Sequence, residues 1–344
     1  MPARYVGICI TLFTPCRRGV AVGTVSTPES AGFLSAGYRE TGMQTLTEKR
    51  VFGAKTGVTD IFVSTDSGVA AVTVSADQIG AFGLARRASA TAVVATADRL
   101  VVGTDQGVLA AEIDAADRSA DVADPAFDAI SDDTIGAVSA IDLTPEGLIV
   151  ADSDGVVYSG EHAGAVTEPP AWQRLGATEE VRAVDAGLLA AADGVYRIDD
   201  DGLTNTGLTD VRAVTGVGQP LAATADGLFR LANGWQPIAD GAFRAVAADG
   251  HGHAHAVCEA GLLVRSADDG AWTTTTPPVE APIVDLTADR GIVAAVTDDG
   301  TLCVTAGDGW RHQRLGLPGA RGVAVGGGAD GSSATHTETP FRGG

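Results

Sequence analysis

A strand–turn–strand unit that recurs along the chain is the feature that most constrains its fold. Each copy consists of a short apolar run, a turn that carries an acidic residue and ends in glycine, and a second apolar run. Aspartate followed by glycine suits tight hairpin turns, because glycine adopts a positive φ without steric cost and aspartate tolerates it better than most residues. The seven turn glycines are Gly68, Gly107, Gly155, Gly194, Gly227, Gly261 and Gly300. Their mean interval is about 39 residues, a period typical of radial β architectures.

Two further strands are predicted in each repeat, one before the hairpin and one after it. Short apolar runs precede the hairpins, as in Val138–Thr144, Val211–Val217 and Ile283–Asp289. After several hairpins a tryptophan opens another strand, at Trp172, Trp235, Trp272 and Trp310. Four strands per repeat, repeated seven times, predict an all-β fold, a seven-bladed β-propeller of four-stranded blades. We expect the tryptophans to pack between blades rather than to form a ligand cage.

The repeats leave two ways to close the ring. Arg321–Gly327 matches the first strand of a repeat but has no hairpin after it, and it is one candidate for the inner strand of the first blade. Val51–Gly57, which shortly precedes the first hairpin, competes for the same position. An eight-bladed ring is the alternative if residues 321–342 build part of another blade.

The charge of the chain bears on its partners and its habitat. Acidic residues outnumber basic ones 44 to 23, a net charge of −21, which argues against nucleic acid and anionic membranes as partners. No apolar run reaches the roughly 18 residues of a membrane span. Lysine occurs only at positions 49 and 55 and asparagine only at 205 and 233. Such a composition is typical of proteins from a high-salt cytoplasm, where carboxylates keep a surface hydrated, although a GC-rich genome produces similar usage.

The first 42 residues differ in charge from the rest of the chain. They contain four arginines, two glutamates and no aspartate. We interpret residues 1–42 as translated upstream sequence, with Met43 as the initiator, or as a disordered extension starting from Met1. A signal peptide fits less well, because the apolar run Tyr5–Phe13 is short and no clean cleavage site follows it. The expected organisation is a propeller over 43–327 and a flexible tail over 328–344.

The hairpin repeats resemble the NHL and WD40-like propeller superfamily. Together with the acidic composition they look most like a family of haloarchaeal β-propeller proteins, with Asp60–Leu84 as the clearest repeat and residues of about 50–327 covered. The resemblance implies the propeller architecture and carries no activity with it. Function therefore has to be argued from side chains.

Two sets of side chains are candidates for chemistry. Aspartates of the hairpin turns would ring one mouth of a propeller channel, at Asp66, Asp105, Asp154, Asp193, Asp226 and Asp299. They suggest a cation site, but aspartate is also simply a preferred turn residue. His251, His253 and His255 alternate, which would place three imidazoles on one face of a strand as a weak candidate metal site. The four cysteines show no spacing typical of zinc sites or disulfide frameworks.

No nucleophile elbow, phosphate-binding glycine loop or zinc-protease motif occurs in the sequence. We therefore expect a non-enzymatic scaffold for protein–protein interaction, monomeric and cytoplasmic, that binds a protein partner and needs no cofactor. The alternative is a metal-dependent hydrolase or lactonase with its site at the channel mouth.

Overall fold

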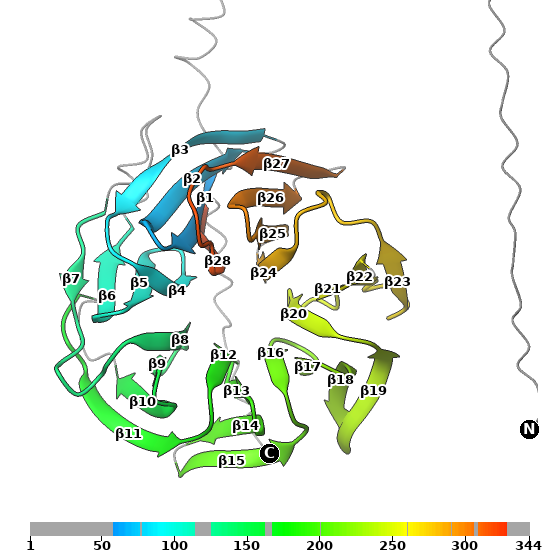
Figure 1. The fold of residues 1–344 in the computed structure, drawn as a ribbon, viewed down its shortest axis with the longest axis horizontal. Coiled ribbons are helices and arrows are strands. Elements are labelled where there is room, and N and C mark those ends of the chain that lie inside the picture. Colours follow the sequence, from blue (N-terminus) through cyan, green and yellow to red (C-terminus); the bar gives the residue numbers. More distant parts are fainter. Residues whose placement is uncertain are drawn as a thin grey trace, which may run out of the picture. The chain divides into compact units, whose positions relative to one another are not determined.

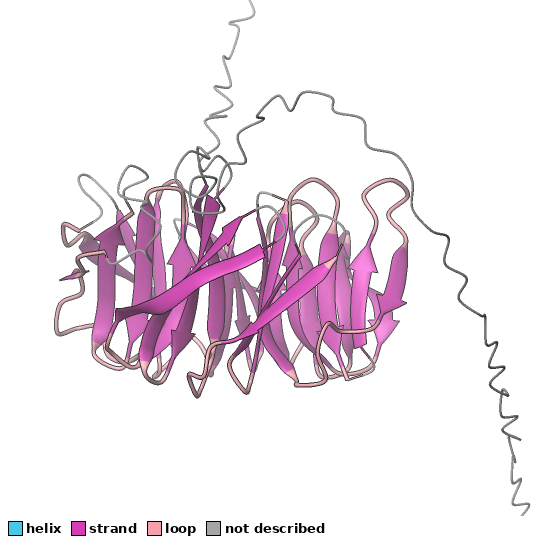
Figure 2. Ribbon diagram, turned by 90° about the horizontal axis from the view of Figure 1, so that it is seen from above, coloured by secondary structure: helices cyan, strands magenta, loops and turns pink. Residues whose placement is uncertain are grey.

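The apolar runs and glycine turns of each repeat fold into one antiparallel sheet, and seven such sheets stand around a common centre (Figure 1). The structure is a computed structural model that describes residues 58–75, 78–113, 125–161, 167–199, 201–259, 261–289, 291–305 and 309–328. The strands of the ring run between its two faces (Figure 2). Within the described residues every sheet has four strands. The predicted seven-bladed β-propeller is confirmed, and the eight-bladed alternative is wrong.

The four strands of each blade follow one another from the centre of the ring to its rim. In that order, blades 1 and 2 contain β28 (Gly322–Gly328), β1 (Val58–Thr65), β2 (Gly68–Ser75) and β3 (Gln78–Arg86), then β4 (Ala90–Ala95), β5 (Arg99–Thr104), β6 (Gly107–Glu112) and β7 (Asp128–Ala129). Blades 3 and 4 contain β8 (Val138–Leu143), β9 (Gly147–Asp152), β10 (Val156–Glu161) and β11 (Ala171–Ala177), then β12 (Val181–Asp185), β13 (Leu188–Ala191), β14 (Gly194–Asp199) and β15 (Gly202–Gly207). Blades 5 and 6 contain β16 (Val211–Thr215), β17 (Leu221–Thr224), β18 (Gly227–Ala232) and β19 (Gly234–Asp240), then β20 (Phe243–Ala248), β21 (Ala254–Cys258), β22 (Gly261–Arg265) and β23 (Trp272–Thr275). Blade 7 contains β24 (Ile283–Asp289), β25 (Ile292–Thr297), β26 (Thr301–Thr305) and β27 (Trp310–Arg314).

The last strand of the chain closes the ring. β28 pairs antiparallel with β1, with Val323 opposite Val63 and Ala324 opposite Phe62. Of the two candidates from the sequence, Arg321–Gly327 therefore supplies the inner strand of the first blade. The competing segment, Val51–Gly57, lies outside the described residues, as does the predicted extension at 1–42. Of the predicted tail at 328–344 only Gly328 is described, and it ends β28.

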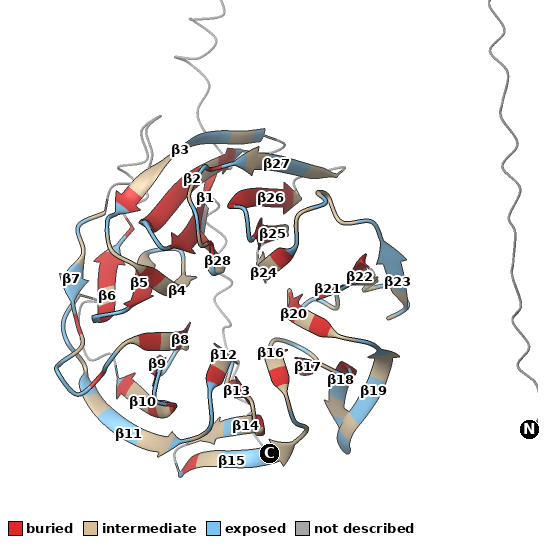
Figure 3. Cartoon of the chain, in the orientation of Figure 1, coloured by how far each residue is buried: buried red, intermediate tan, exposed pale blue. Residues whose placement is uncertain are grey.

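The hydrophobic core lies between the blades rather than within one central cluster. Buried side chains form seven clusters among the described residues, one at each junction of neighbouring blades. At the closing junction, for example, Val72 of blade 1 and Val296 of blade 7 belong to the same cluster. The second strand of each blade is mostly buried, the inner strands are partly buried, and the outermost strands are largely exposed (Figure 3). Alanine and valine dominate these clusters because sheets that pack face to face in a small ring leave little room for larger side chains.

A β-bulge recurs near the start of the inner strands. In blades 2 to 7 the pairing with the second strand shifts between the first and third residues of the inner strand. The residue left unpaired in blades 4, 5 and 6 is an arginine, at Arg182, Arg212 and Arg244. A bulge of this kind turns a side chain away from the regular alternation of the strand.

A buried threonine stabilises four of the hairpin turns. The hydroxyl group of Thr65 donates a hydrogen bond to the carbonyl oxygen of Gly68 at 2.7 Å and accepts one from the Gly68 N–H at 3.2 Å. Thr104 donates to the Gly107 carbonyl at 2.8 Å, and Thr224 and Thr297 make equivalent bonds across their own turns. The hydroxyl therefore satisfies buried backbone groups that the tight turn leaves without a partner.

Candidate functional site

The inner strands of all seven blades line a central channel. It encloses a cavity of about 380 Å³, lined by residues of β4, β8, β12, β16, β20, β24 and β28. These strands are the free inner edges of their sheets, so their outward N–H and C=O groups face the channel. Any side chain that satisfies them has to come from a neighbouring blade or from the strand itself.

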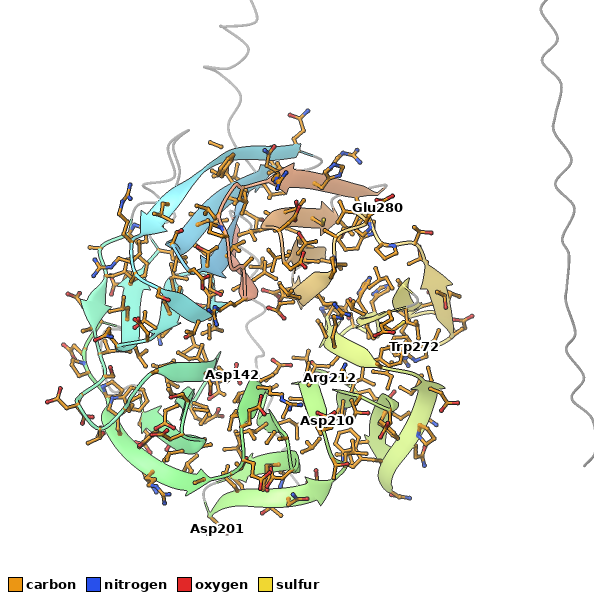
Figure 4. All side chains as sticks on the ribbon, in the orientation of Figure 1. Asp142, Asp201, Asp210, Arg212, Trp272 and Glu280 are labelled. Atoms are coloured by element: carbon orange, nitrogen blue, oxygen red, sulfur yellow. The ribbon has the colours of Figure 1, made fainter. Side chains whose placement is uncertain are left out.

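Three aspartates of the channel wall each accept a hydrogen bond from a backbone N–H group of the next blade. Asp142 Oδ2 accepts a hydrogen bond from the Ala186 N–H at 2.9 Å, and its Oδ1 accepts one from the Leu143 N–H at 2.8 Å. Figure 4 shows Asp142 beside the central opening. Asp185 Oδ2 accepts from the Gly216 N–H at 3.2 Å, which joins blade 4 to blade 5 in the same way.

The third aspartate joins blade 7 to the strand that closes the ring. Asp285 Oδ2 accepts a hydrogen bond from the Val323 N–H at 2.9 Å. Asp285 lies two residues earlier in its strand than Asp142 and Asp185 do in theirs. Asp142 and Asp185 do not stand out in the sequence, because an aspartate near the end of a strand also fits the following turn, and nothing marks Asp285 within its strand.

Burial changes the ionisation of these carboxyl groups. It raises the pKa of Asp142 to about 6, and the negative charge of Asp185 adds to the increase. Burial likewise raises the pKa of Asp285 to about 6 and raises the pKa of Asp185. The backbone hydrogen bonds favour the charged form and oppose this shift, but desolvation is the larger effect. The channel wall therefore contains carboxyl groups that take up protons in mildly acidic solution.

Arginines lie at the first residues of the inner strands, at the end of the channel where these strands begin. Arg182, which lines the cavity, donates from Nη1 to Asp210 Oδ1 at 2.6 Å and from Nη2 to Glu180 Oε2 at 3.2 Å. Arg321, at the same end of blade 1, donates from Nη2 to Asp66 Oδ1 at 2.7 Å. One ion pair between blades 4 and 5 and one within blade 1 therefore lie at this end of the channel, where solvent screens them and limits their contribution to stability.

Two of the turn aspartates predicted from the hairpins accept hydrogen bonds within their own hairpin, and Asp66 pairs with Arg321. Asp193 accepts from the Tyr196 hydroxyl at 2.6 Å, and Asp299 accepts from the hydroxyl groups of Thr297 and Thr301. None of the six turn aspartates lines the channel cavity. Their contacts agree with the structural interpretation, in which aspartate stabilises its own turn.

The three alternating histidines do not share one strand face. β21 begins at Ala254, so only His255 belongs to a strand, where it is buried. Burial lowers the pKa of His255 to about 4, and its Nδ1 has no hydrogen-bond partner among the described residues. His253 is exposed in the preceding turn, with its Nδ1 2.9 Å from Asp249 Oδ2, and the N–H of His251 donates to Asp249 Oδ1. Across the residues that the structure describes, no three histidine, cysteine, aspartate or glutamate side chains lie where they could hold one metal ion.

The tryptophans pack between blades, as the sequence predicted. Trp172, Trp235, Trp272 and Trp310 all pack against the interblade clusters. Trp172 also donates from Nε1 to the Ile130 carbonyl at 3.1 Å, and Trp235 donates to the Thr206 hydroxyl at 3.3 Å. Of the cysteines, Cys258 and Cys303 are free thiols, and Cys9 and Cys16 lie outside the described residues.

Sequence comparison places this architecture in a family. The family model described as "Beta-prop_HVO_0234:-like, beta propeller" matches residues 45–326. The chain belongs to this family. The propeller part of the resemblance seen in the sequence is thereby confirmed, while the haloarchaeal origin stays a prediction. No curated protein matches the chain in sequence.

Solved structures share the fold at low identity. The WD40 β-propeller domain of Doa1 is 14% identical, with a TM-score of 0.51 over 66% of this chain and 82% of that chain. AztD from Citrobacter koseri is 8% identical, with a TM-score of 0.48 over 79% and 99%. PorZ, a surface component of the type-IX secretion system of Porphyromonas gingivalis, is 16% identical, with a TM-score of 0.42 over 53% of this chain. The chain spans only 28% of PorZ. At these identities the Doa1 likeness shows the fold alone.

Within the described part of the chain, no helical segment has the length and hydropathy that a bilayer crossing requires.

Proposed function

We propose that the protein is a non-enzymatic scaffold for protein–protein interaction. The observation that carries this proposal is the use of the channel carboxylates. Asp142, Asp185 and Asp285 each accept a hydrogen bond from a backbone N–H of the next blade. Carboxyl groups bound in this way hold the ring together and are poorly placed to act on a substrate, because their acceptor oxygens are already occupied.

The rest of the molecule suits a scaffold. Seven interblade clusters among the described residues fix the blades relative to one another. Turns and outer strands on such a ring are presented in fixed positions, so a partner that binds several of them loses little of its binding energy to ordering this protein.

Affinity capture of the full chain from the source cells at its native expression level tests the proposal. The captured complex would be crosslinked, identified by mass spectrometry and then rebuilt from purified components. The expected result is one protein that co-purifies at a fixed stoichiometry and binds the purified chain directly. Metal-dependent hydrolysis of a lactone or ester by the purified chain, with no such partner, would replace the scaffold by the hydrolase predicted as the alternative.

A further inference from the structure

The three bulge arginines occupy one repeated position at the end of the channel where the inner strands begin. Arg182, Arg212 and Arg244 are each the second residue of the inner strand, in blades 4, 5 and 6. The pairing shift at each of them turns the side chain away from the regular alternation of the strand. Because β12, β16 and β20 stand next to one another in the ring (Figure 1), the three positions form a row.

Arg182 shows where a side chain at this position reaches. Its Nη1 donates to Asp210 Oδ1 at 2.6 Å and to the Val211 carbonyl oxygen at 3.3 Å, both at the start of the inner strand of the next blade. Its Nη2 donates to Oε2 of Glu180, which immediately precedes β12. A carboxylate before its own strand and a carboxylate before the next strand therefore neutralise Arg182.

The equivalent positions around Arg244 carry no carboxylate. The residue before its own strand is Ala242, and the residue before the inner strand of blade 7 is Pro282. Neither side chain can accept a hydrogen bond from a guanidinium group. The positions that neutralise Arg182 therefore leave Arg244 uncompensated.

Arg212 has only half of the arrangement around Arg182. Asp210 precedes its strand, but the hydrogen bond from Arg182 is the main cause of the lowered pKa of Asp210, and the charge of Arg212 contributes least to it. The residue before the next inner strand is again Ala242. The one nearby carboxylate is therefore already bound to another arginine.

Burial separates these two side chains from the other arginines. Five arginines in the described part of the chain are half-buried. Three of them have a carboxylate or a backbone carbonyl within hydrogen-bond or ion-pair distance: Arg99, Arg182 and Arg265. Arg212 and Arg244 have no such partner among the described residues. A guanidinium group that is partly withdrawn from water gains free energy from an anion that supplies the missing acceptor.

We propose that Arg212 and Arg244 bind a small oxyanion, of the phosphate or carboxylate type, at the seam between blades 5 and 6, where β16 and β20 begin side by side. The oxyanion would accept hydrogen bonds from both guanidinium groups, whose planar sets of N–H donors match the paired oxygens of these anions. This inference goes beyond the proposed scaffold function, because the site needs no protein partner.

The neighbouring carboxylates favour a small anion over an acidic protein surface. Asp210 lies two residues before Arg212. Asp226 is exposed in the hairpin turn of blade 5, and its carbonyl oxygen accepts from the Gly241 N–H at 3.0 Å, close to the start of blade 6. An acidic protein surface laid over this seam would meet these carboxylates as well as the arginines, which opposes its binding. A single phosphate group is small enough to contact only the guanidinium groups.

Equilibrium dialysis of the purified full chain against radiolabelled inorganic phosphate tests the site. We expect about one phosphate per chain with a Kd on the order of 1 mM, and weaker binding as sodium chloride is added. Arg212→Gln and Arg244→Gln should each weaken binding by about fivefold, and the double variant by about twentyfold or more. Arg212→Lys keeps the charge without the paired donors, so its loss should be smaller than that of Arg212→Gln. Citrate should compete for the same site.

Two exposed arginines elsewhere provide the matched control. Arg174→Gln on β11 and Arg230→Gln on β18 remove the same charge from side chains that also have no ion-pair partner among the described residues. Their double variant has the same net charge as Arg212→Gln/Arg244→Gln, and it should bind phosphate like the wild type. Circular dichroism spectra and melting temperatures in chloride should agree for all variants, which shows that a loss of binding is not a loss of fold.

Three results would overturn the proposal. The first is no phosphate binding by the wild type at concentrations up to about 10 mM. The second is binding that survives in Arg212→Gln/Arg244→Gln or that the control double variant loses equally. The third is displacement of phosphate by a glutamate decapeptide at a far lower concentration than citrate requires, because the occupant would then be an acidic segment of a partner protein. Partner capture is measured separately, so the anion site can fail while the scaffold function stands.

Discussion

Asp285 Oδ2 accepts a hydrogen bond from the backbone N–H of Val323 at 2.9 Å, across the junction where the last strand closes the ring. Asp142 and Ala186 repeat this relationship between blades 3 and 4. Both carboxyl groups titrate near pH 6 because the channel wall desolvates them. The contacts that join neighbouring blades therefore include groups whose charge changes in mildly acidic solution.

Stability should rise as the pH falls from about 7.5 to about 5. A carboxyl group whose pKa is raised by folding binds protons more tightly in the folded state, so its contribution is fully present below the unfolded value near 4 and is lost as the pH rises through the folded value. Asp142 and Asp285 each contribute roughly 1 to 3 kcal/mol to this change. Urea unfolding followed by circular dichroism between pH 4.5 and 8 measures it.

Variants assign this pH dependence to the channel. Asp142→Asn and Asp285→Asn keep an acceptor oxygen and remove the titration, so the double variant should show a much flatter profile. Asp201→Asn is the matched control, because Asp201 is exposed in a turn at the outer rim (Figure 4). A double variant with the slope of the wild type would assign the dependence to the general acidity of the surface instead.

Closure by β28 predicts a sharp boundary for truncation. Val323, Ala324 and Val325 are buried against blade 1 and its neighbours. A chain ending at Ala320 loses these contacts and exposes the edge of β1, at a cost of roughly 5 kcal/mol or more. A chain ending at Gly328 keeps every described contact of the closure and should melt at the wild-type temperature. Differential scanning calorimetry measures the melting temperature of each of the two chains. Equal melting temperatures would show that β28 contributes little to the stability of the ring.

The repeat made the fold predictable because each turn glycine fixes a hairpin and the hairpins recur. The closing strand was only narrowed to two candidates, because both Arg321–Gly327 and Val51–Gly57 have the pattern of a first strand. The sequence repeat is least regular in blade 2. The interval from Gly107 to Gly155 is 48 residues, no tryptophan marks the fourth strand there, and β7 has only two residues.

The candidate site could not be read from the sequence in the same way. Asp142 looks like a strand-end residue and Asp285 like any other residue of its strand until the ring places the next blade's N–H groups beside them. The bulge that displaces Arg182 depends on pairing between strands, which a single strand sequence does not encode.

Threonine at the hairpins gives a third prediction. Thr104 is buried, donates to the Gly107 carbonyl and accepts from the Gln106 N–H at 3.1 Å. Thr104→Val keeps the shape but leaves both backbone groups unpaired, which should destabilise the fold by about 1 to 3 kcal/mol. Thr104→Ser keeps the hydroxyl and should lose less than half of that. Urea midpoints measured at one pH compare the two, and an equal loss would show that the methyl group rather than the hydroxyl matters.

A substitution in the hairpin turn of blade 3 tests whether glycine is required at the end of a hairpin for its backbone conformation. Gly155 has a φ of 79°, and a Cβ atom there would collide with the backbone carbonyl oxygen of Thr178. Gly155→Ala should therefore destabilise the fold by at least about 1 to 2 kcal/mol from the left-handed backbone alone, and by more from the collision. Gly136→Ala is the matched control, because a Cβ atom at Gly136 meets no atom within 4 Å. That variant should be neutral or slightly stabilising, since alanine reduces the freedom of the unfolded chain. If thermal unfolding gave the two variants the same stability, the turn glycines would reflect the composition of the chain rather than a conformational requirement of the ring.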